Sequence, residues 1–180
     1  MPRHISANDD SSNGFVILLT DQQSDHAVDE SRLVEAARGV LKDSKFTSAA
    51  ISLAVVDDPT IHELNRRYLN HDSPTDVLSF VLASEDGHLE GEVVISADTA
   101  ALAAVEAGWT SEAEQLLYII HGVLHLVGYD DKTPAGESQM RSEEERYLAR
   151  FGFDGRHLPP SEARMAGHLA SGCTDGEAPQ

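Results

Sequence analysis

Cysteine is almost absent from this sequence of 180 residues. The single cysteine, Cys173, lies in a polar stretch near the C-terminus, so the chain offers neither a disulfide framework nor a thiolate zinc site. Any bound metal must therefore be held by His, Asp or Glu side chains. The sequence also contains no glycine-rich phosphate loop of either familiar spacing, which argues against nucleotide chemistry of those kinds.

Basic residues are also scarce. The chain carries 13 Lys and Arg against 31 Asp and Glu, for a net charge of −18. This balance excludes a broad basic surface that would bind nucleic acid regardless of its sequence. Binding to a polyanion would need a local basic patch or a protein partner.

Long hydrophobic runs are missing as well. No stretch approaches the roughly 18 uninterrupted apolar residues needed to span a bilayer, and the polar residues 1–13 contain no apolar signal-peptide core. We therefore expect a cytoplasmic protein with no membrane contact.

What remains is enough for one folded unit, because 41% hydrophobic residues suffice to build a single buried core at this length. Residues 1–13 are polar, and we expect them to form a disordered tail. Residues 155–180 are rich in Gly, Ala, Ser, Pro and acidic side chains, which predicts a flexible acidic tail. The folded domain is predicted to cover residues 14–154.

Hydrophobic periodicity within this domain predicts strands first and helices mostly later. The predicted strands cover residues 15–19, 49–56, 77–82 and 92–95, with a polar loop over 83–91. The predicted helices cover residues 29–42, 58–68, 98–107, 111–127 and 134–151. This order indicates an α+β domain, a sheet of about four strands covered by helices.

The segment LLYIIHGVLHLV, residues 116–127, is apolar on nearly every face, which predicts a buried helix. Two histidines in such a setting require an explanation. His121 and His125 are four residues apart, so their imidazoles lie one turn apart on the same face and can reach one ion.

A third candidate ligand follows this pair. Gly128 is a natural helix stop, and Asp131 lies six residues after His125. The spacing from His121 matches the metzincin pattern of two ligands, a glycine turn and a third ligand, here a carboxylate. Asp130 competes with Asp131 for this position. Two histidines and one carboxylate suit zinc, although iron or nickel is also compatible.

The residue after the first histidine argues against peptidase chemistry. Zinc peptidases of this spacing place a glutamate there as the general base, and here the position is Gly122. The metal-binding pattern is similar, but the base is missing.

Two further segments accompany the histidine motif. These are LNRRYLNHDSPTDVLSF over residues 64–80 and GEVVIS over residues 91–96. Together with HGVLHLVGYDD over residues 121–131, they strongly resemble the YbeY family of rRNA-maturation endoribonucleases. Three motifs in the right order carry this resemblance, which covers residues 48–152.

The resemblance implies an α+β fold, zinc bound through three histidines, and a role in small-subunit rRNA maturation and ribosome quality control. It makes His121 and His125 the first two ligands of one zinc ion per chain. Asp131 stands where the family has its third histidine, and this carboxylate should make the metal a weaker Lewis acid. Glu92 replaces the usual aspartate of the strand motif.

The upstream motif supplies tentative catalytic residues. The family favours an arginine directly after the motif's tyrosine, and here that position is Leu69. Arg66 and Arg67 are the nearest cations in sequence, and we take Arg66 as the candidate. Asp76 is the candidate general base, with Asp72 as its rival; for each of these carboxylates, a role in turn structure is the competing interpretation.

The predicted function is therefore a zinc-dependent single-strand endoribonuclease that acts in small-subunit rRNA maturation and ribosome quality control. Its expected partners are the ribosomal RNA precursor and the small ribosomal subunit, reached through a protein partner because the chain is acidic. Two alternatives stay open: a ribosome-assembly factor that keeps the metal site but has little nuclease activity, and a metal-dependent peptidase-like hydrolase.

Overall fold

A five-stranded mixed sheet forms the centre of the fold in a computed structural model that describes residues 5–7 and 14–153. The strand order is β1-β2-β3-β5-β4, with β2, β3 and β5 parallel and the two outer strands antiparallel to their neighbours. The strands are β1 Ile5–Ala7, β2 Phe15–Asp21, β3 Ser48–Val56, β4 Val77–Glu85 and β5 His88–Ser96.

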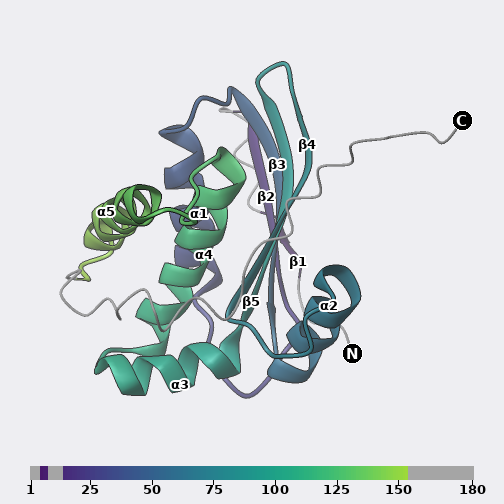
Figure 1. The fold of residues 1–180 in the computed structure, drawn as a ribbon, viewed down its shortest axis with the longest axis vertical. Helices are drawn as coiled ribbons and strands as arrows, with labels where there is room; N and C mark the ends of the chain where they lie inside the picture. The colour runs from purple at the N-terminus through teal and green to yellow at the C-terminus, as the bar shows by residue number, and fades with distance from the viewer. Residues whose placement is uncertain (1–4, 8–13, 154–180) are drawn as a thin grey trace, which may run out of the picture.

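Helices cover both faces of this sheet unequally. In Figure 1, α1, α4 and α5 lie on one side of the sheet, α2 lies on the other, and α3 runs across the bottom of the view. The helices are α1 Glu30–Lys42, α2 Asp58–Leu69, α3 Ala97–Ala107, α4 Ser111–Val127 and α5 Pro134–Arg150. No helix among the described residues combines the length and apolar character that crossing a membrane requires.

The larger core lies between the sheet and the α1–α4 layer. Along β2, the side chains of Phe15, Ile17 and Leu19 are buried while those between them are exposed, as a strand with one covered face requires. Helix α4 is buried along most of its length, as its apolar sequence predicts. A second, smaller core forms where α2 packs on the other face around Ile61.

The α+β prediction is confirmed, and the predicted helices and strands are present. The polar loop expected over residues 83–91 is wrong for most of its length, because β4 and β5 continue through it as a hairpin. Only Asp86 and Gly87 form the turn, with φ angles of 49° and 79°. Positive φ at two central residues is the requirement of a type I′ hairpin turn, and Asp-Gly is one of its preferred sequences.

The start of the chain also differs from expectation. β1 lies within residues 1–13, which were expected to be a disordered tail, and pairs with β2, with Ile5 opposite Thr20. This pairing adds a fifth strand at the edge of the sheet. The remainder of that predicted tail, and the predicted tail over residues 155–180, lie outside the described residues.

Candidate metal centre

Helix α4 carries both histidines of the central motif. The Thr110 side chain caps its N-terminus by accepting a hydrogen bond from the Ala113 amide, and Gly128 ends it with a φ of 108°. His121 and His125 lie in the second half of the helix, with side chains 15% and 6% exposed. Their burial in an apolar helix requires partners for both ring nitrogens.

Each imidazole uses one nitrogen to contact an oxygen acceptor. The Nδ1 atom of His125 lies 3.0 Å from the carbonyl oxygen of Tyr129, and the Nδ1 atom of His121 lies 2.7 Å from Glu144 Oε1. A carbonyl or an ionised carboxylate can only accept, so both Nδ1 atoms donate. The two Nε2 atoms face one region and lie 2.9 Å apart, and in the neutral form of both rings each carries a lone pair directed there.

Asp131 completes this group. Its Oδ2 atom lies 3.9 Å from His121 Nε2 and 3.8 Å from His125 Nε2, and within the described residues these three are brought together as a possible metal-binding group. Tetrahedral zinc with bonds of about 2.0–2.1 Å places its ligand atoms roughly 3.3 Å apart. The observed separations bracket that value, so the donor set fits a zinc ion after small side-chain movements.

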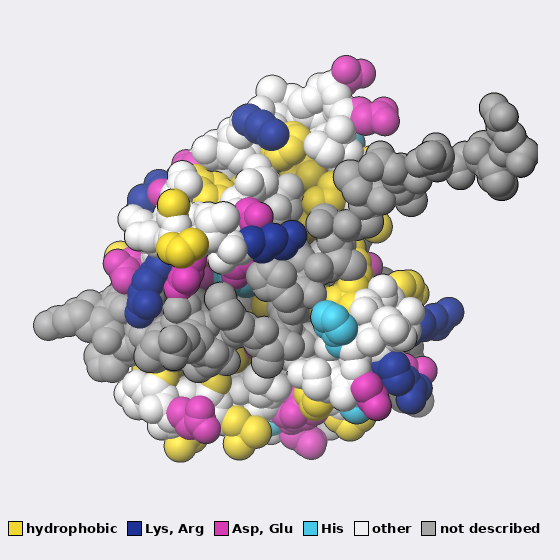
Figure 2. All heavy atoms as spheres, in the orientation of Figure 1, with side chains coloured by type: hydrophobic (Ala, Val, Ile, Leu, Met, Phe, Trp, Pro, Cys, Tyr) yellow, Lys and Arg dark blue, Asp and Glu magenta, His cyan; other side chains and the backbone are white. Residues whose placement is uncertain are grey.

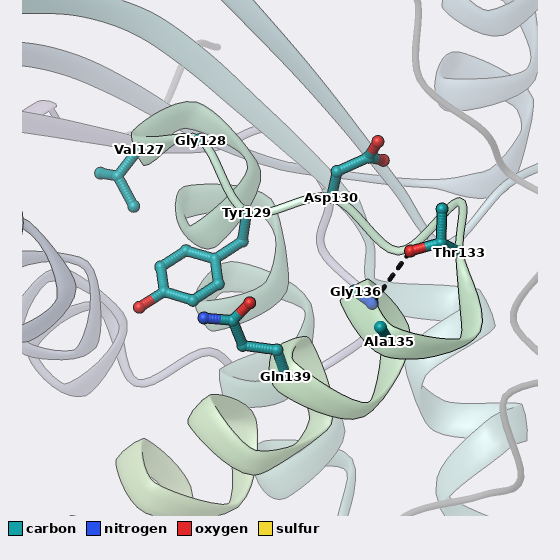
Figure 3. A pocket seen from close by; sticks show the side chains of 8 residues that line it. All are labelled: Val127, Gly128, Tyr129, Asp130, Thr133, Ala135, Gly136 and Gln139. Atoms are coloured by element: carbon teal, nitrogen blue, oxygen red, sulfur yellow. Dashed lines mark hydrogen bonds between the residues drawn. The ribbon is translucent and has the colours of Figure 1, made fainter.

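The structure brings Asp131, rather than Asp130, to the histidines. Asp130 is exposed, and its Oδ1 atom accepts a hydrogen bond of 3.3 Å from the Lys132 amide. Asp130 lines a pocket of about 510 Å³ beside the turn together with Tyr129 and Gln139, and in Figure 3 its side chain points away from theirs. The metal-ligand role of Asp131 remains a prediction.

The start of α5 fixes the backbone of this turn. Thr133 caps the helix by accepting a hydrogen bond from the Gly136 amide at 3.1 Å, drawn as the dashed line in Figure 3. A Cβ atom on Gly136 would lie 2.2 Å from the carbonyl oxygen of Asp130. Only glycine permits this approach, which sets the position of the turn next to Asp131.

Gly122 has a structural role at the position where zinc peptidases have their glutamate. A Cβ atom there would lie 2.5 Å from Val93 Cγ1 and 2.9 Å from Ser79 Oγ, so α4 packs directly on β4 and β5. The Ser79 hydroxyl donates a hydrogen bond of 3.2 Å to the Gly122 carbonyl oxygen. A glutamate side chain has no space at this position, and the residue faces the sheet.

Asp76 lies near enough to His121 for a protonated His121 ring to lower the pKa of its carboxyl. Burial raises the pKa of the Asp76 carboxyl above its ordinary value, against the opposing effects of His121 and of local hydrogen bonds. Those bonds come from the Val77 amide at 2.9 Å and the Thr75 hydroxyl at 3.1 Å. A carboxylate with a raised pKa near a metal site is suited to accept a proton.

The remaining candidates from the upstream motif lie on or next to α2, across the sheet from α4 (Figure 1). Arg66 is exposed on α2, and its catalytic role stays a prediction. Asp72 contacts His62 at 2.9 Å with a side chain 79% exposed. Leu69, at the position of the family arginine, packs against the smaller core. These contacts favour structural roles for Asp72 and Leu69.

Sequence reasoning missed Glu144, which contacts His121 from α5. Its side chain is only 2% exposed. On this helix Met140, Glu144 and Leu148 are spaced four apart and all buried, so Glu144 interrupts an apolar stripe. A carboxylate in such a stripe is the signal that could have identified it.

Comparisons with known proteins agree on one family. A family model described as Endoribonuclease YbeY matches residues 18–152. An Endoribonuclease YbeY from Salinibacter ruber is 46% identical over 116 residues, covering 59% of this chain and 73% of that protein. Another from Syntrophotalea carbinolica is 40% identical over 133 residues, covering 71% and 89%.

A solved structure is similar as well. The solution structure of TM1509 from Thermotoga maritima matches with a TM-score of 0.51 and 29% sequence identity. The match covers 74% of this chain and 86% of that chain. The similarity therefore extends over most of the part of the chain that forms the sheet and its helices.

Proposed function

This chain belongs to the YbeY family of endoribonucleases, and we propose that it is a zinc-dependent endoribonuclease that cleaves single-stranded RNA in small-subunit rRNA maturation and ribosome quality control. The observation that carries the proposal is the convergence of two Nε2 atoms 2.9 Å apart beside the Asp131 carboxylate. When both rings are neutral and donate from Nδ1, their Nε2 lone pairs face each other and repel, and a shared cation removes that repulsion.

His121, His125 and Asp131 would hold the zinc ion. Bound there, zinc would supply Lewis acidity, which lowers the pKa of a water and polarises a phosphodiester oxygen. The Asp131 carboxylate adds negative charge, so we expect weaker Lewis acidity than with three neutral histidines. Two protein nitrogens and one oxygen leave room for water and substrate, as catalytic sites require.

Asp76 would act as the proton acceptor for the attacking water. Two features support this role: Asp76 lies near His121, and its raised pKa makes its carboxylate a stronger base. Arg66 would stabilise charge on the phosphate once RNA is bound. Its exposed position on α2 leaves the guanidinium accessible to a bound RNA strand.

The acidic surface supports recruitment by a partner protein. On the face shown in Figure 2, the coloured Lys and Arg side chains stand apart from one another among Asp and Glu. Among the described residues, the candidate phosphate-binding cations are Arg66 and Arg67 on α2, across the sheet from α4, and Lys132 and Arg141 in the turn after α4 and in α5. These four are too few for a long phosphate track. We therefore expect weak, salt-sensitive binding to isolated RNA, and recruitment to small ribosomal subunits or their precursors in the cytoplasm by a ribosomal protein or maturation factor.

A ribosome-assembly factor with little nuclease activity is the second candidate. It is favoured by Leu69, which packs in the smaller core where the family has an arginine, and by the carboxylate of Asp131. A peptidase is disfavoured, because the position of its glutamate base is filled by the contact of Gly122 with the sheet.

One experiment separates these functions. Zinc-loaded protein is incubated with labelled single-stranded RNA and with casein, beside its Asp76→Asn variant. We expect RNA cleavage by the wild type, strongly reduced cleavage by D76N, and intact casein. Absence of RNA cleavage, together with full correction of an rRNA processing defect by a His125→Ala gene copy, would favour the assembly factor. Cleavage of casein would favour the peptidase.

A further inference from the structure

Glu144 is a buried carboxylate with a specific contact to a candidate metal ligand. Its Oε1 atom lies 2.7 Å from His121 Nδ1, and its side chain is 2% exposed. Burying a charge is costly unless the charge is paired and hydrogen-bonded. A carboxylate at this buried position, within the apolar stripe of α5, therefore points to a role beyond packing.

We propose that Glu144 is a positioning residue of the metal centre, which holds His121 with its Nε2 atom facing His125 and Asp131 and thereby increases metal affinity. The inference rests on the metal-dependent function proposed above. By accepting the Nδ1–H proton, the carboxylate fixes both the tautomer and the orientation of the ring. It also makes the imidazole a stronger electron donor.

The two histidines are oriented by different kinds of partner. His125 donates to the Tyr129 carbonyl oxygen at 3.0 Å, within the turn that ends α4. His121 donates to a side chain 23 residues further along the chain. Backbone geometry thus orients one ligand, whereas the orientation of the other depends on the packing of α5 against α4.

Charge balance supports the same role. Asp131 and Glu144 each contribute one negative charge to a partly buried cluster in which both histidines are neutral when each keeps a lone pair on Nε2. A divalent cation neutralises the two carboxylates, so the buried charge of Glu144 is compensated when metal binds. Removal of that charge should weaken metal binding more than it weakens the metal-free fold.

The test is the metal affinity of Glu144→Gln, measured with zinc and cobalt by competition with a chromophoric chelator. We expect about 10–100-fold weaker metal binding, the usual cost of losing a residue that hydrogen-bonds to a metal ligand. The visible spectrum of the cobalt form should also change, because the ligand orientation is altered. The matched control is Glu145→Gln on the same helix, where the side chain is 47% exposed and pairs with Arg141; its affinity should stay within about twofold of wild type.

Thermal unfolding separates positioning from a structural role. Metal-free E144Q should keep its Tm within a few degrees of the metal-free wild type, while the Tm gain on adding zinc should shrink. A large loss of Tm in the metal-free form with unchanged zinc affinity would overturn the inference. If E144Q does not fold, Glu144→Asp takes its place, since it keeps the charge but retracts the carboxylate by one methylene.

Weaker metal binding by E144D with an unchanged metal-free Tm would support the inference, and wild-type affinity would overturn it. Metal binding by the wild type tests the proposed metal-dependent function independently of Glu144. If wild-type protein binds neither zinc nor cobalt, the proposed metal-dependent function fails. If wild type and E144Q bind both metals equally and give the same cobalt spectrum, the positioning role alone fails.

Discussion

Two of the polar clusters among the described residues join a histidine to a carboxylate with hydrogen bonds of nearly equal length, but their proposed functions differ. In the metal-site cluster, His121 contacts Glu144 at 2.7 Å; in the second cluster, His26 contacts Asp98 at 2.8 Å. The metal-site cluster comprises His121, His125, Asp131 and Glu144. The second, which we call the helix-cap cluster, comprises His26, Asp58, Ser96, Asp98 and Thr99.

The helix-cap cluster satisfies the ends of helices. Asp98 accepts from the Asp58 amide at 2.9 Å on one oxygen and contacts His26 with the other. The hydroxyls of Ser96 and Thr99 donate to Asp58 Oδ1. Because Asp58 and Asp98 lie in the first turns of α2 and α3, these bonds link the N-termini of the two helices.

The metal-site cluster differs from the helix-cap cluster because its polar atoms point toward one shared region. Its outer contacts fix both Nδ1 atoms, and the two Nε2 atoms converge beside a carboxylate. A histidine–carboxylate contact is therefore no evidence of a metal site by itself. Convergence of several donors on one region is the feature that distinguishes the two clusters.

The largest expected effect is the loss of metal on removing a converging histidine. Loss of a residue that only hydrogen-bonds to a metal ligand usually weakens metal binding by about 10–100-fold. His125→Ala and His121→Ala each remove a ligand itself, so each should weaken zinc binding by more than that. His26→Ala, which removes a histidine from the helix-cap cluster, should leave the metal content unchanged. Elemental analysis after dialysis measures all three. If H121A and H125A both kept their full metal content, the proposed difference between the metal-site cluster and the helix-cap cluster would be wrong.

Asp131→Ala should weaken zinc binding by roughly 10–100-fold or more, because it removes the converging oxygen. Asp130→Ala should have little effect, since the Asp130 side chain caps the turn. Asp131→His should restore or tighten binding, as it supplies the third histidine of the family. Competition with a chelator measures the affinities, and the reverse ranking of the two alanine variants would assign the ligand to Asp130.

A smaller effect is expected from the packing that places α4. Gly122→Ala should lower the free energy of unfolding by about 1–3 kcal/mol, because the new Cβ atom would meet Val93 Cγ1 at 2.5 Å. The matched control is Gly39→Ala in α1, where the nearest atom lies at 3.5 Å. That variant should be neutral or slightly more stable, because alanine favours helix. Denaturant unfolding measures both, and equal stability of G122A and wild type would refute the close contact.

The smallest effect concerns the helix-cap cluster. Asp98→Asn should cost about 1 kcal/mol, the usual worth of a helix cap, without changing metal affinity. The Asp58 amide and His26 hold the pKa of Asp98 below its ordinary value despite desolvation. A carboxyl with a lowered folded pKa stabilises the fold above its unfolded pKa and loses that contribution as pH falls through the folded pKa.

The stability difference between wild type and D98N should therefore be present at neutral pH. It should shrink on acidification below about pH 4, the ordinary range of an aspartate pKa. Denaturant midpoints measured between neutral and acidic pH give the result. A stability difference between wild type and D98N that grows as pH falls would contradict this prediction.

The candidate site was predictable where its residues lie on one helix. The i, i+4 spacing of His121 and His125 determines that both rings share a face, and α4 has this geometry. The choice between Asp130 and Asp131 was left open, because successive residues after a helix end can point either way. The hairpin over residues 83–91 has a local signal in the sequence, because Asp-Gly is a preferred dipeptide of tight hairpin turns, and this signal outweighs the polar composition that predicts a loop.

By itself the sequence determined the α+β class, the buried helix with its two histidines, and the family to which the chain belongs. These depend on periodicity and on motifs that are local along the chain. Only the tertiary structure decided that Gly122 touches the sheet, that Asp131 turns toward the histidines and that Glu144 supports His121. Such contacts join residues from different elements, and they follow from how α4 packs against the sheet and α5, which no local pattern specifies.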